Sequence, residues 1–466
     1  MSLDAHETPV GAVKAALAEL GPIFGERLLT SAAARAHYGA AESWLPAAPP
    51  DAVLLLHDTA EVSQALAICH RHGAPVIPFG AGSSIEGQVL APQGGITLDL
   101  SGMDRVLAVH AEDMDCIVQC GTPRQRLNEE LRDCGLFFPV DLGAHATLGG
   151  MASTRASGTT TVRYGSMREL VLGLAVVLPD GQVIRTGGRA RKSASGYDLT
   201  HLFVGAEGTL GVITELTLRL FGIPAAAQSL LCSFAELNAA TGCVVEALQF
   251  GLGVSRIELA DELQMRAINA YCGTDLPESP TLWVEITGSD PAVAHDVALF
   301  RDLAESAGAS RIELAQTPED AAKLWRIRHD ALYATRALRP GVTGLSTDVC
   351  VPLSRLPECI AAIKAEIAET GLVAPLVGHV GDGNFHLVLL FDASDPAELA
   401  LGKRISARLV ELALAMEGTA TGEHGVGLGK KDYMAAEHGP ALELMRRLKQ
   451  AVDPRGIMNP GKIFDL

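Results

Sequence analysis

Two histidines, His379 and His386, flank a tight glycine turn in the segment Gly378–His386. Apolar runs on both sides predict two strands, and the dipeptide Asp382-Gly383 between them predicts a hairpin. Folding about that dipeptide would place His379 directly opposite His386, with Cβ atoms about 4.5–5.5 Å apart. That separation allows both imidazoles to bind one metal ion. The alternative is that both are ordinary polar residues on a solvated strand face.

A second segment, further along the chain, adds the groups that such a metal site would need. Glu423 and His424 lie in a glycine-framed loop, Gly422–Gly425, and supply a carboxylate and a third imidazole. Two histidines plus one carboxylate, with coordination positions left open, are typical of a catalytic rather than a structural metal site. We therefore predict a catalytic site for a divalent metal.

Length and composition limit the class of protein. The 466 residues suffice for two or three domains, and the 48% that are hydrophobic suit a packed interior. A formal charge of −18 argues against nucleic acid or an anionic membrane as partner. Nine cysteines without a Cys-x-x-Cys pair indicate free thiols in a reducing compartment. Met1–Lys14 lacks the character of a targeting signal, and no apolar run reaches the roughly 18 residues of a membrane span. We expect a cytoplasmic protein.

The elements that must position these residues fall into two parts. Short strands and helices alternate up to Ile223-Pro224, the clearest domain boundary. Before that boundary, Pro139–Gly165 is dense in Gly, Ala, Ser and Thr and lacks the apolar periodicity of a helix or strand. Such a stretch suits backbone lying against a flat ligand. Beyond the boundary, helices and strands alternate as in a sheet covered by helices on one face, and the histidine segment belongs to this part.

The loop Phe79–Ser84 follows a predicted strand, Pro75–Phe79. A glycine-rich turn at that place can direct successive N–H groups at a diphosphate. It is not the dinucleotide fingerprint, because the third glycine and the acidic residue are missing, and it is not a Walker A loop, because no Gly-Lys-Ser/Thr follows. Taken alone, the loop could equally be an ordinary turn.

A series of motifs in the same order resolves this ambiguity by resemblance. Three motifs resemble the FAD domain of the vanillyl-alcohol-oxidase type flavoproteins: Pro78–Ser84, Gly143–Met151 and Gly205–Gly211. The later segments resemble its FAD-linked D-2-hydroxy-acid branch: Gly378–His386, Gly422–Gly425 and Asn459–Lys462. That branch includes cytochrome-linked D-lactate dehydrogenases, glycolate oxidase catalytic subunits and D-2-hydroxyglutarate dehydrogenases. The segment Ser346–Pro352 looks most like the D-lactate dehydrogenases.

The resemblance implies an α+β fold with a two-part FAD-binding domain and a cap domain, whose antiparallel sheet carries helices on one face. The domains expected are an N-terminal helical segment (1–48), an FAD-binding domain (49–222), a cap domain that binds substrate and metal (223–416), and a C-terminal segment that returns to the FAD domain (417–466). The residues implied to bind FAD are Phe79, Gly80, Ala81, Gly82, Ser83, Ser84, Pro139, Thr147, Gly149, Gly150, Ser153, Gly158, Glu207, Gly211, Ile213 and Asn459. Because Phe79–Gln88 contains neither His nor Cys, we predict non-covalent FAD.

The resemblance also implies roles in the chemistry. His379, His386 and Glu423 would bind zinc or manganese, and His424 would be the general base that removes the hydroxyl proton of a 2-hydroxy acid. Arg328 would bind the substrate carboxylate. The alternative is that Arg328 lies on a solvated helix face. Hydroxyglutarate enzymes carry a lysine near the position of Ser346, so its absence here favours a monocarboxylate.

The sequence therefore predicts an FAD- and metal-dependent D-2-hydroxy-acid dehydrogenase, with D-lactate as the first substrate to test. Without a nicotinamide site, electrons would pass to a cytochrome, a quinone or an electron-transferring flavoprotein. Alternatives are a glycolate oxidase subunit, a D-2-hydroxyglutarate dehydrogenase, a non-redox alkyl transferase of the same fold, a non-catalytic partner subunit, and a non-haem iron oxygenase, which would leave the FAD loops without a purpose.

Overall fold

The structure is a computed structural model that describes residues 9–41 and 43–466. The start of the predicted N-terminal segment, residues 1–8, lies outside the described residues. The chain forms two compact units. Unit 1 consists of Met1–Ala156, Ser166–Ile223 and Glu423–Leu466, and unit 2 consists of Ser157–Gly165 and Pro224–Gly422.

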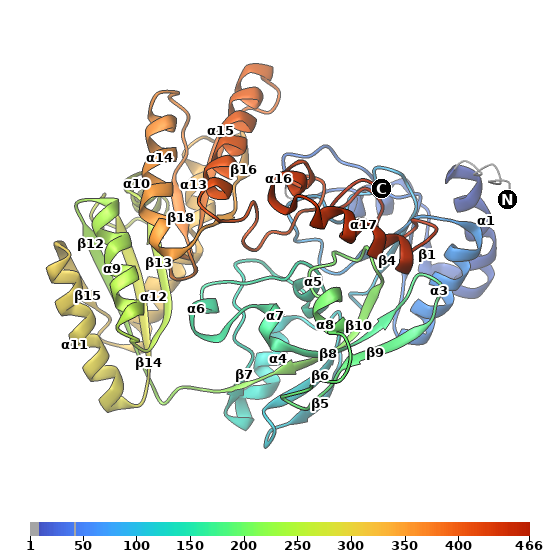
Figure 1. The fold of residues 1–466 in the computed structure, drawn as a ribbon, viewed down its shortest axis with the longest axis horizontal. Helices are drawn as coiled ribbons and strands as arrows, with labels where there is room; N and C mark the ends of the chain where they lie inside the picture. Colours follow the sequence, from blue (N-terminus) through green and yellow to red (C-terminus); the bar gives the residue numbers. More distant parts are fainter. Residues whose placement is uncertain (1–8, 42) are drawn as a thin grey trace. The chain divides into compact units, whose positions relative to one another are not determined.

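Unit 1 contains two main sheets (Figure 1). A four-stranded sheet has the order β1-β2-β4-β3, in which β4 runs parallel to both β2 and β3. A five-stranded antiparallel sheet has the order β5-β6-β10-β8-β9. The strands are β1 (Leu28–Leu29), β2 (Ala52–Leu55), β3 (Val76–Phe79), β4 (Ile96–Asp99), β5 (Val106–His110), β6 (Asp115–Gln119), β7 (Leu136–Phe137), β8 (Val171–Val177), β9 (Val183–Gly187), β10 (Val212–Arg219) and β11 (Phe221–Gly222). The helices are α1 (Pro9–Phe24), α2 (Ala32–Tyr38), α3 (Thr59–His72), α4 (Arg124–Leu131), α5 (Leu148–Ser153), α7 (Met167–Leu170), α8 (Leu199–Phe203), α16 (Met434–His438) and α17 (Ala441–Val452).

One hydrophobic core joins the two sheets of unit 1. It includes Leu66 of α3, Leu98 of β4 and Leu216 of β10, none of which is exposed. Because parallel strands are covered on both faces, β4 is buried along its whole length. The stretch predicted to lack regular structure contains the short helix α5 and, in unit 2, α6 (Thr161–Tyr164). Their four to six residues are too few to show a helical apolar period.

Unit 2 is built on one eight-stranded antiparallel sheet of order β15-β12-β14-β13-β18-β19-β16, with β17 also paired to β19. Its strands are β12 (Ala226–Phe234), β13 (Val254–Ala260), β14 (Thr281–Gly288), β15 (Ala309–Leu314), β16 (Thr343–Ser346), β17 (Val349–Cys350), β18 (Leu376–Gly378) and β19 (Asn384–Phe391). Its longer helices are α9 (Leu237–Gln249), α10 (Glu262–Cys272), α11 (Asp290–Ser306), α12 (Pro318–His329), α13 (Ala331–Ala337), α14 (Leu356–Ala368) and α15 (Pro396–Ala415).

Helices cover both faces of this sheet rather than the single face expected. All eight residues of β19 are buried, whereas a strand with one solvated face would alternate between buried and exposed. On one face, α10, α12 and α13 pack against Leu231 and Trp283 of β12 and β14. In a second group, α9 packs against β12 and β13, and α11 packs against β12 and β14 (Figure 1).

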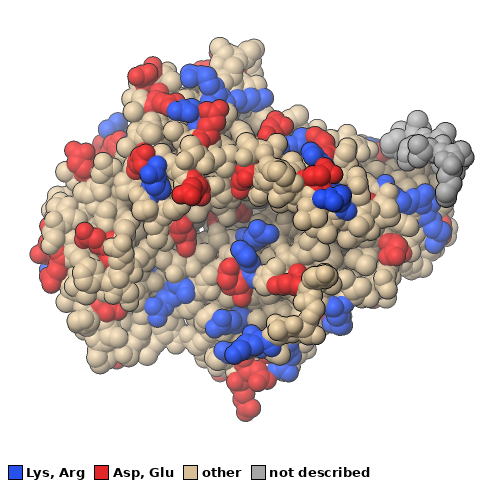
Figure 2. Space-filling view, in the orientation of Figure 1, with Lys and Arg blue, Asp and Glu red and all other residues tan. Residues whose placement is uncertain are grey.

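The surface carries charges of both signs. In the view of Figure 2, acidic and basic side chains are interspersed within each unit. Over the part of the chain that the structure describes, none of the helices combines the length and the hydropathy needed to cross a membrane.

Candidate functional site

The loop after β3 has the backbone of an anion-binding site. Gly80 to Ser84 donate no backbone hydrogen bond to any described residue, and Ser84 Oγ is buried without a partner among those residues. A Cβ at Gly80 would lie 2.3 Å from Thr147 Oγ1, and Gly82 has φ +69°. Consecutive donors that the protein leaves unused, on a loop that excludes side chains, fit a diphosphate.

The motif around α5 and the loop Gly205–Gly211 lie against each other. Thr147 caps α5 by accepting a hydrogen bond from Gly150 N (3.3 Å), and Gly149 N donates to Cys120 O (2.7 Å). Ser153 O accepts from Glu207 N at 2.8 Å. Small residues in α5 permit this close backbone packing, since a Cβ at Gly149 would lie 2.5 Å from Cys120 Cβ.

Glu207 holds the C-terminal segment of unit 1 in place. Its buried carboxylate accepts hydrogen bonds from the backbone N–H of Val426 (2.6 Å) and Gly427 (2.9 Å). Asn459 Nδ2 donates to Glu207 O at 2.7 Å. Burial raises the pKa of Glu207 to about 7, against the two backbone N–H groups, which favour the ionised form. Burial likewise lowers the pKa of the neighbouring Lys462 to about 8.

The structure gathers most residues nominated for FAD in unit 1. Pro139 is buried, Gly211 packs against Val177 O, and Ile213 lies in β10 with 6% exposure. Gly158 belongs to unit 2. The unused donors, the buried Ser84 hydroxyl and the glycine-lined approach together fit FAD.

In unit 2, the histidine hairpin forms, but its register differs from the prediction. Val377, not His379, pairs with His386, because Val380–Asp382 form a 3₁₀ turn that Gly383 closes with φ +78°. The predicted two-residue turn is therefore wrong. The rings still meet: their centroids are 5.5 Å apart at an interplanar angle of 82°.

Both imidazoles use Nδ1 to contact the protein. His379 Nδ1 lies 2.7 Å from Glu258 Oε1, and His386 Nδ1 lies 2.9 Å from Thr347 O. Both acceptors fix the tautomer with the proton on Nδ1, so Nε2 is the atom with which each ring can bind a metal. Both side chains are mostly buried, at 13% and 9% exposure, and therefore are not on a solvated strand face. This pair fits a divalent metal such as zinc or manganese.

Arg328, at the end of α12, is buried rather than on a solvated helix face. It is 8% exposed and its Nη2 donates to Glu258 Oε2 at 2.5 Å. Burial raises the pKa of Glu258, but its interactions with His379 and Arg328 outweigh burial and hold that pKa below its ordinary value. Glu258 is therefore an ionised carboxylate that links the two nominated residues.

Three polar residues beside the histidines were missed by sequence reasoning. Asp348 accepts hydrogen bonds from Asn384 Nδ2 (2.8 Å) and Thr421 Oγ1 (2.7 Å), and it lies 3.8 Å from His386 Nδ1. Asn384 Oδ1 is buried with no partner in the described chain. Glu258 was missed as well. Its signal is a glutamate within the apolar strand of β13, where an ionised side chain needs a partner.

Glu423 and His424 belong to unit 1 and directly follow Gly422, the last residue of unit 2. Both are partly buried. His424 Nδ1 lies 4.0 Å from Glu86 Oε1, and Gln88 Nε2 donates to His424 O at 2.8 Å. Gln88 therefore holds the backbone of His424, and Glu86 is a carboxylate near its imidazole.

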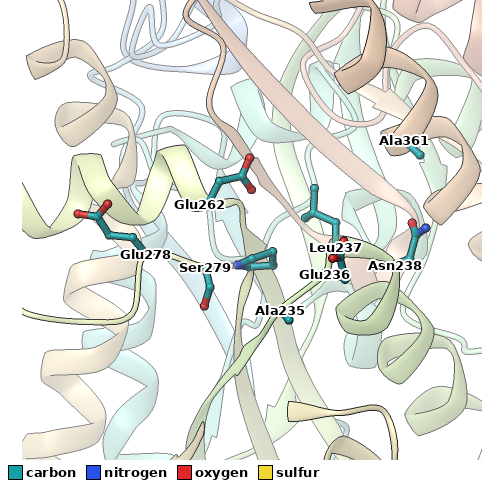
Figure 3. A pocket seen from close by; sticks show the side chains of 9 residues that line it. Ala235, Glu236, Leu237, Asn238, Glu262, Glu278, Ser279 and Ala361 are labelled. Carbon is teal, nitrogen blue, oxygen red and sulfur yellow. The ribbon is translucent and has the colours of Figure 1, made fainter. Parts of the chain in front are cut away.

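A cavity of about 370 Å³ in unit 2 has a different lining (Figure 3). It is bordered by Glu236, Glu262, Glu278 and Ser279, with Leu237 at the start of α9. None of the nominated residues lines it, and its carboxylates would repel an organic acid. It is not the substrate site.

Comparison with known proteins first establishes the class. The chain superposes on the solved structure of p-cresol methylhydroxylase with a TM-score of 0.80, over 99% of this chain and 98% of that one, at 19% identity. This likeness confirms the α+β flavoprotein fold of the vanillyl-alcohol-oxidase type, with an FAD-binding and a cap domain.

Sequence comparison then gives the family. Residues 223–463 match the FAD linked oxidases, C-terminal domain, and residues 50–187 match the FAD binding domain. The chain belongs to the FAD-linked oxidases, and FAD is its cofactor. It is 46% identical to the probable mitochondrial D-lactate dehydrogenase of Danio rerio, over 95% of this chain and 90% of that protein. It is also 46% identical to the mitochondrial D-lactate dehydrogenase (cytochrome) of Arabidopsis thaliana, over 89% of this chain and 73% of that protein.

These relatives correct the expected location. Both are named as mitochondrial proteins, so the expectation of a cytoplasmic protein is wrong. That expectation rested on the lack of a targeting pattern in Met1–Lys14, on the cysteine usage and on the lack of an apolar run long enough to span a membrane.

Proposed function

We propose that this protein oxidises D-lactate, or a similar D-2-hydroxy monocarboxylate, to the 2-oxo acid and passes the electrons to a cytochrome. The observation that carries the proposal is the buried contact of Glu258 with both His379 and Arg328 in unit 2, with the ring of His386 next to that of His379. A histidine pair that can bind a metal, together with a guanidinium, would supply the two groups that bind the hydroxyl and the carboxylate of a 2-hydroxy acid. The names of the two D-lactate dehydrogenases at 46% identity support this choice of substrate, and the name of the Arabidopsis thaliana protein supports a cytochrome as acceptor.

Two bound groups would supply the chemistry that side chains cannot. When bound, FAD would accept a hydride from the α-carbon, and a divalent metal, zinc or manganese, would polarise the substrate hydroxyl. His379 and His386 would hold the metal through Nε2, with Glu423 as the carboxylate ligand. Glu423 follows Gly422 in the chain, and a Cβ at Gly422 would lie 2.2 Å from Asn384 Nδ2, beside the hairpin. FAD is held without a covalent bond by the loops of unit 1.

Arg328 binds and orients the substrate. Its guanidinium is buried, and its Nε has no partner among described residues, so it retains a donor for the substrate carboxylate. His424 takes the hydroxyl proton at Nε2, since its Nδ1 is buried near Glu86. Fixing both ends of the substrate aligns its α-carbon and supplies much of the rate enhancement.

The strand before Asp348 favours a monocarboxylate. Ser346 lies in β16, directly before Thr347, whose carbonyl meets His386. A dicarboxylate would need a second cation in this region, and Ser346 supplies a neutral hydroxyl instead. D-lactate has one carboxylate and needs no second cation, whereas D-2-hydroxyglutarate has two carboxylates.

Steady-state turnover tests the proposal. With cytochrome c or a redox dye as acceptor, D-lactate should be oxidised with kcat/KM at least about tenfold above glycolate and D-2-hydroxyglutarate. His424→Ala should lower kcat by about 100-fold or more and leave FAD content unchanged. His438→Ala, a partly exposed histidine of the same unit, is the matched control and should match the parent. A preference for glycolate or D-2-hydroxyglutarate, or an unchanged rate in His424→Ala, would contradict the proposal.

A further inference from the structure

We infer that Glu258 is a positioning residue that sets the tautomer of His379 and the separation between His379 and Arg328. The inference rests on the proposed function, because it gives these two residues one substrate to share. A 2-hydroxy acid carries its hydroxyl and carboxylate on adjacent carbons. The distance between a metal on His379 and the guanidinium of Arg328 must therefore match the distance between the hydroxyl and the carboxylate of the substrate.

Strand pairing brings Glu258 to this place. In the register of β13 and β18, Leu259 pairs with Gly378, so Glu258 and His379 extend the same pair by one residue on each strand. Glu258 has no exposed surface. Its two oxygens belong to one rigid carboxylate: Oε1 contacts His379 Nδ1 at 2.7 Å and Oε2 accepts from Arg328 Nη2 at 2.5 Å.

The bond to His379 is not needed for charge balance. A buried carboxylate costs several kcal/mol unless it is paired, and Arg328 alone provides that pair. The contact between Glu258 and His379 instead sets the tautomer of the imidazole, because an ionised carboxylate can only accept a hydrogen bond. It keeps the proton of His379 on Nδ1 and leaves Nε2 as the metal-binding atom.

A nearby carboxylate shows what a structural role looks like. Asp261 is also buried, caps α10 by accepting from Gln264 N (2.8 Å), and pairs with Lys364 Nζ at 2.5 Å. Its partners are a helix end and a lysine, not a histidine of the hairpin. Asp261→Asn, which retains the capping oxygen, is therefore a matched control for the loss of a buried, paired carboxylate.

Glu258→Gln tests the inference with little change in shape. The amide oxygen can still accept from Arg328, but the amide NH₂ would donate to His379 Nδ1 and move the imidazole proton to Nε2. After chelation of the FAD-loaded protein, titration with Zn²⁺ or Mn²⁺ alone should show a Kd raised about 10–100-fold in Glu258→Gln. At saturating metal, KM for D-lactate should rise by more than kcat falls. Glu258→Asp, which restores a carboxylate, should recover part of the metal affinity, and Asp261→Asn should match the parent.

The wild-type chain provides a second measurement that does not depend on how a variant folds. In ¹⁵N-histidine NMR spectra, the resonances lost in His379→Asn should show a proton on Nδ1. Parental metal affinity in folded Glu258→Gln, or an unprotonated Nδ1 in the wild type, overturns the inference while leaving the proposed function intact. A wild-type chain that binds neither metal overturns the inference together with the metal part of the proposed function, even if D-lactate is still oxidised.

Discussion

The pH dependence of stability should change when Glu207 is replaced by glutamine. Glu207 is buried in unit 1, and its carboxylate accepts hydrogen bonds from the backbone N–H of Val426 and Gly427. Burial raises its pKa from the ordinary 4.5 to about 7. At pH values between these two pKa values, Glu207 is protonated in the folded protein and ionised in the unfolded chain. The stability that this proton contributes is complete below the unfolded pKa and is lost as pH rises through the folded one.

The size of the effect follows from the two pKa values. A separation of about 2.5 pH units corresponds to about 3 kcal/mol, since one unit is worth about 1.4 kcal/mol. Most of this should appear between about pH 5 and about pH 8. A glutamine does not titrate, so the free energy of unfolding of the parent minus that of Glu207→Gln should fall by about 2–3 kcal/mol over this range.

Urea unfolding followed by flavin fluorescence measures this difference, because the FAD loops belong to the same unit as Glu207. Glu112→Gln, which removes an exposed carboxylate of unit 1, controls for the loss of one charge. A difference that stays constant or increases from about pH 5 to about pH 8 would refute the reasoning.

Three further predictions concern the cofactor and the substrate. Gly80→Ala should weaken FAD binding at least about tenfold and lower stability by about 1 kcal/mol, because its Cβ would displace the capping hydroxyl of Thr147. Gly188→Ala, with open space around its Cβ, is the control in an FAD titration. Arg328→Lys should raise KM for D-lactate at least about tenfold in steady-state kinetics, because an ammonium cannot bind the carboxylate of Glu258 and of the substrate as a planar fork; an unchanged KM would remove Arg328 from the substrate site. Acid precipitation should release the FAD into the supernatant, and a yellow pellet would disprove non-covalent binding.

The FAD-binding loops could be predicted from sequence because their function is local. Each depends on backbone N–H groups and on glycines a few residues apart, as in Gly80 and Gly82, so a short motif is enough to nominate the loop. The motif alone does not distinguish an anion-binding loop from an ordinary turn, and the family resemblance was needed for that choice. The family resemblance and the α+β fold are confirmed. The helices on both faces of the cap sheet were missed, because a strand buried on both faces, such as β19, has a continuous apolar run that does not identify what covers it.

The sequence correctly predicted that the two histidine rings meet, but it predicted the wrong turn and strand register. The rings meet, but through a 3₁₀ turn that shifts the register, which a two-residue turn signal cannot anticipate. Glu258 could not be assigned from sequence, because it lies 121 residues before His379 and 70 before Arg328. Partners this distant are set by sheet order and helix packing, which no local motif encodes.

Anaerobic titration of the flavin spectrum tests the central claim most directly. D-lactate should bleach the oxidised flavin band of the FAD-loaded protein in the absence of any acceptor, L-lactate should not, and prior removal of the metal by a chelator should slow the bleaching at least about tenfold. A flavin that stays oxidised with D-lactate, or that L-lactate reduces equally fast, would contradict the proposed function.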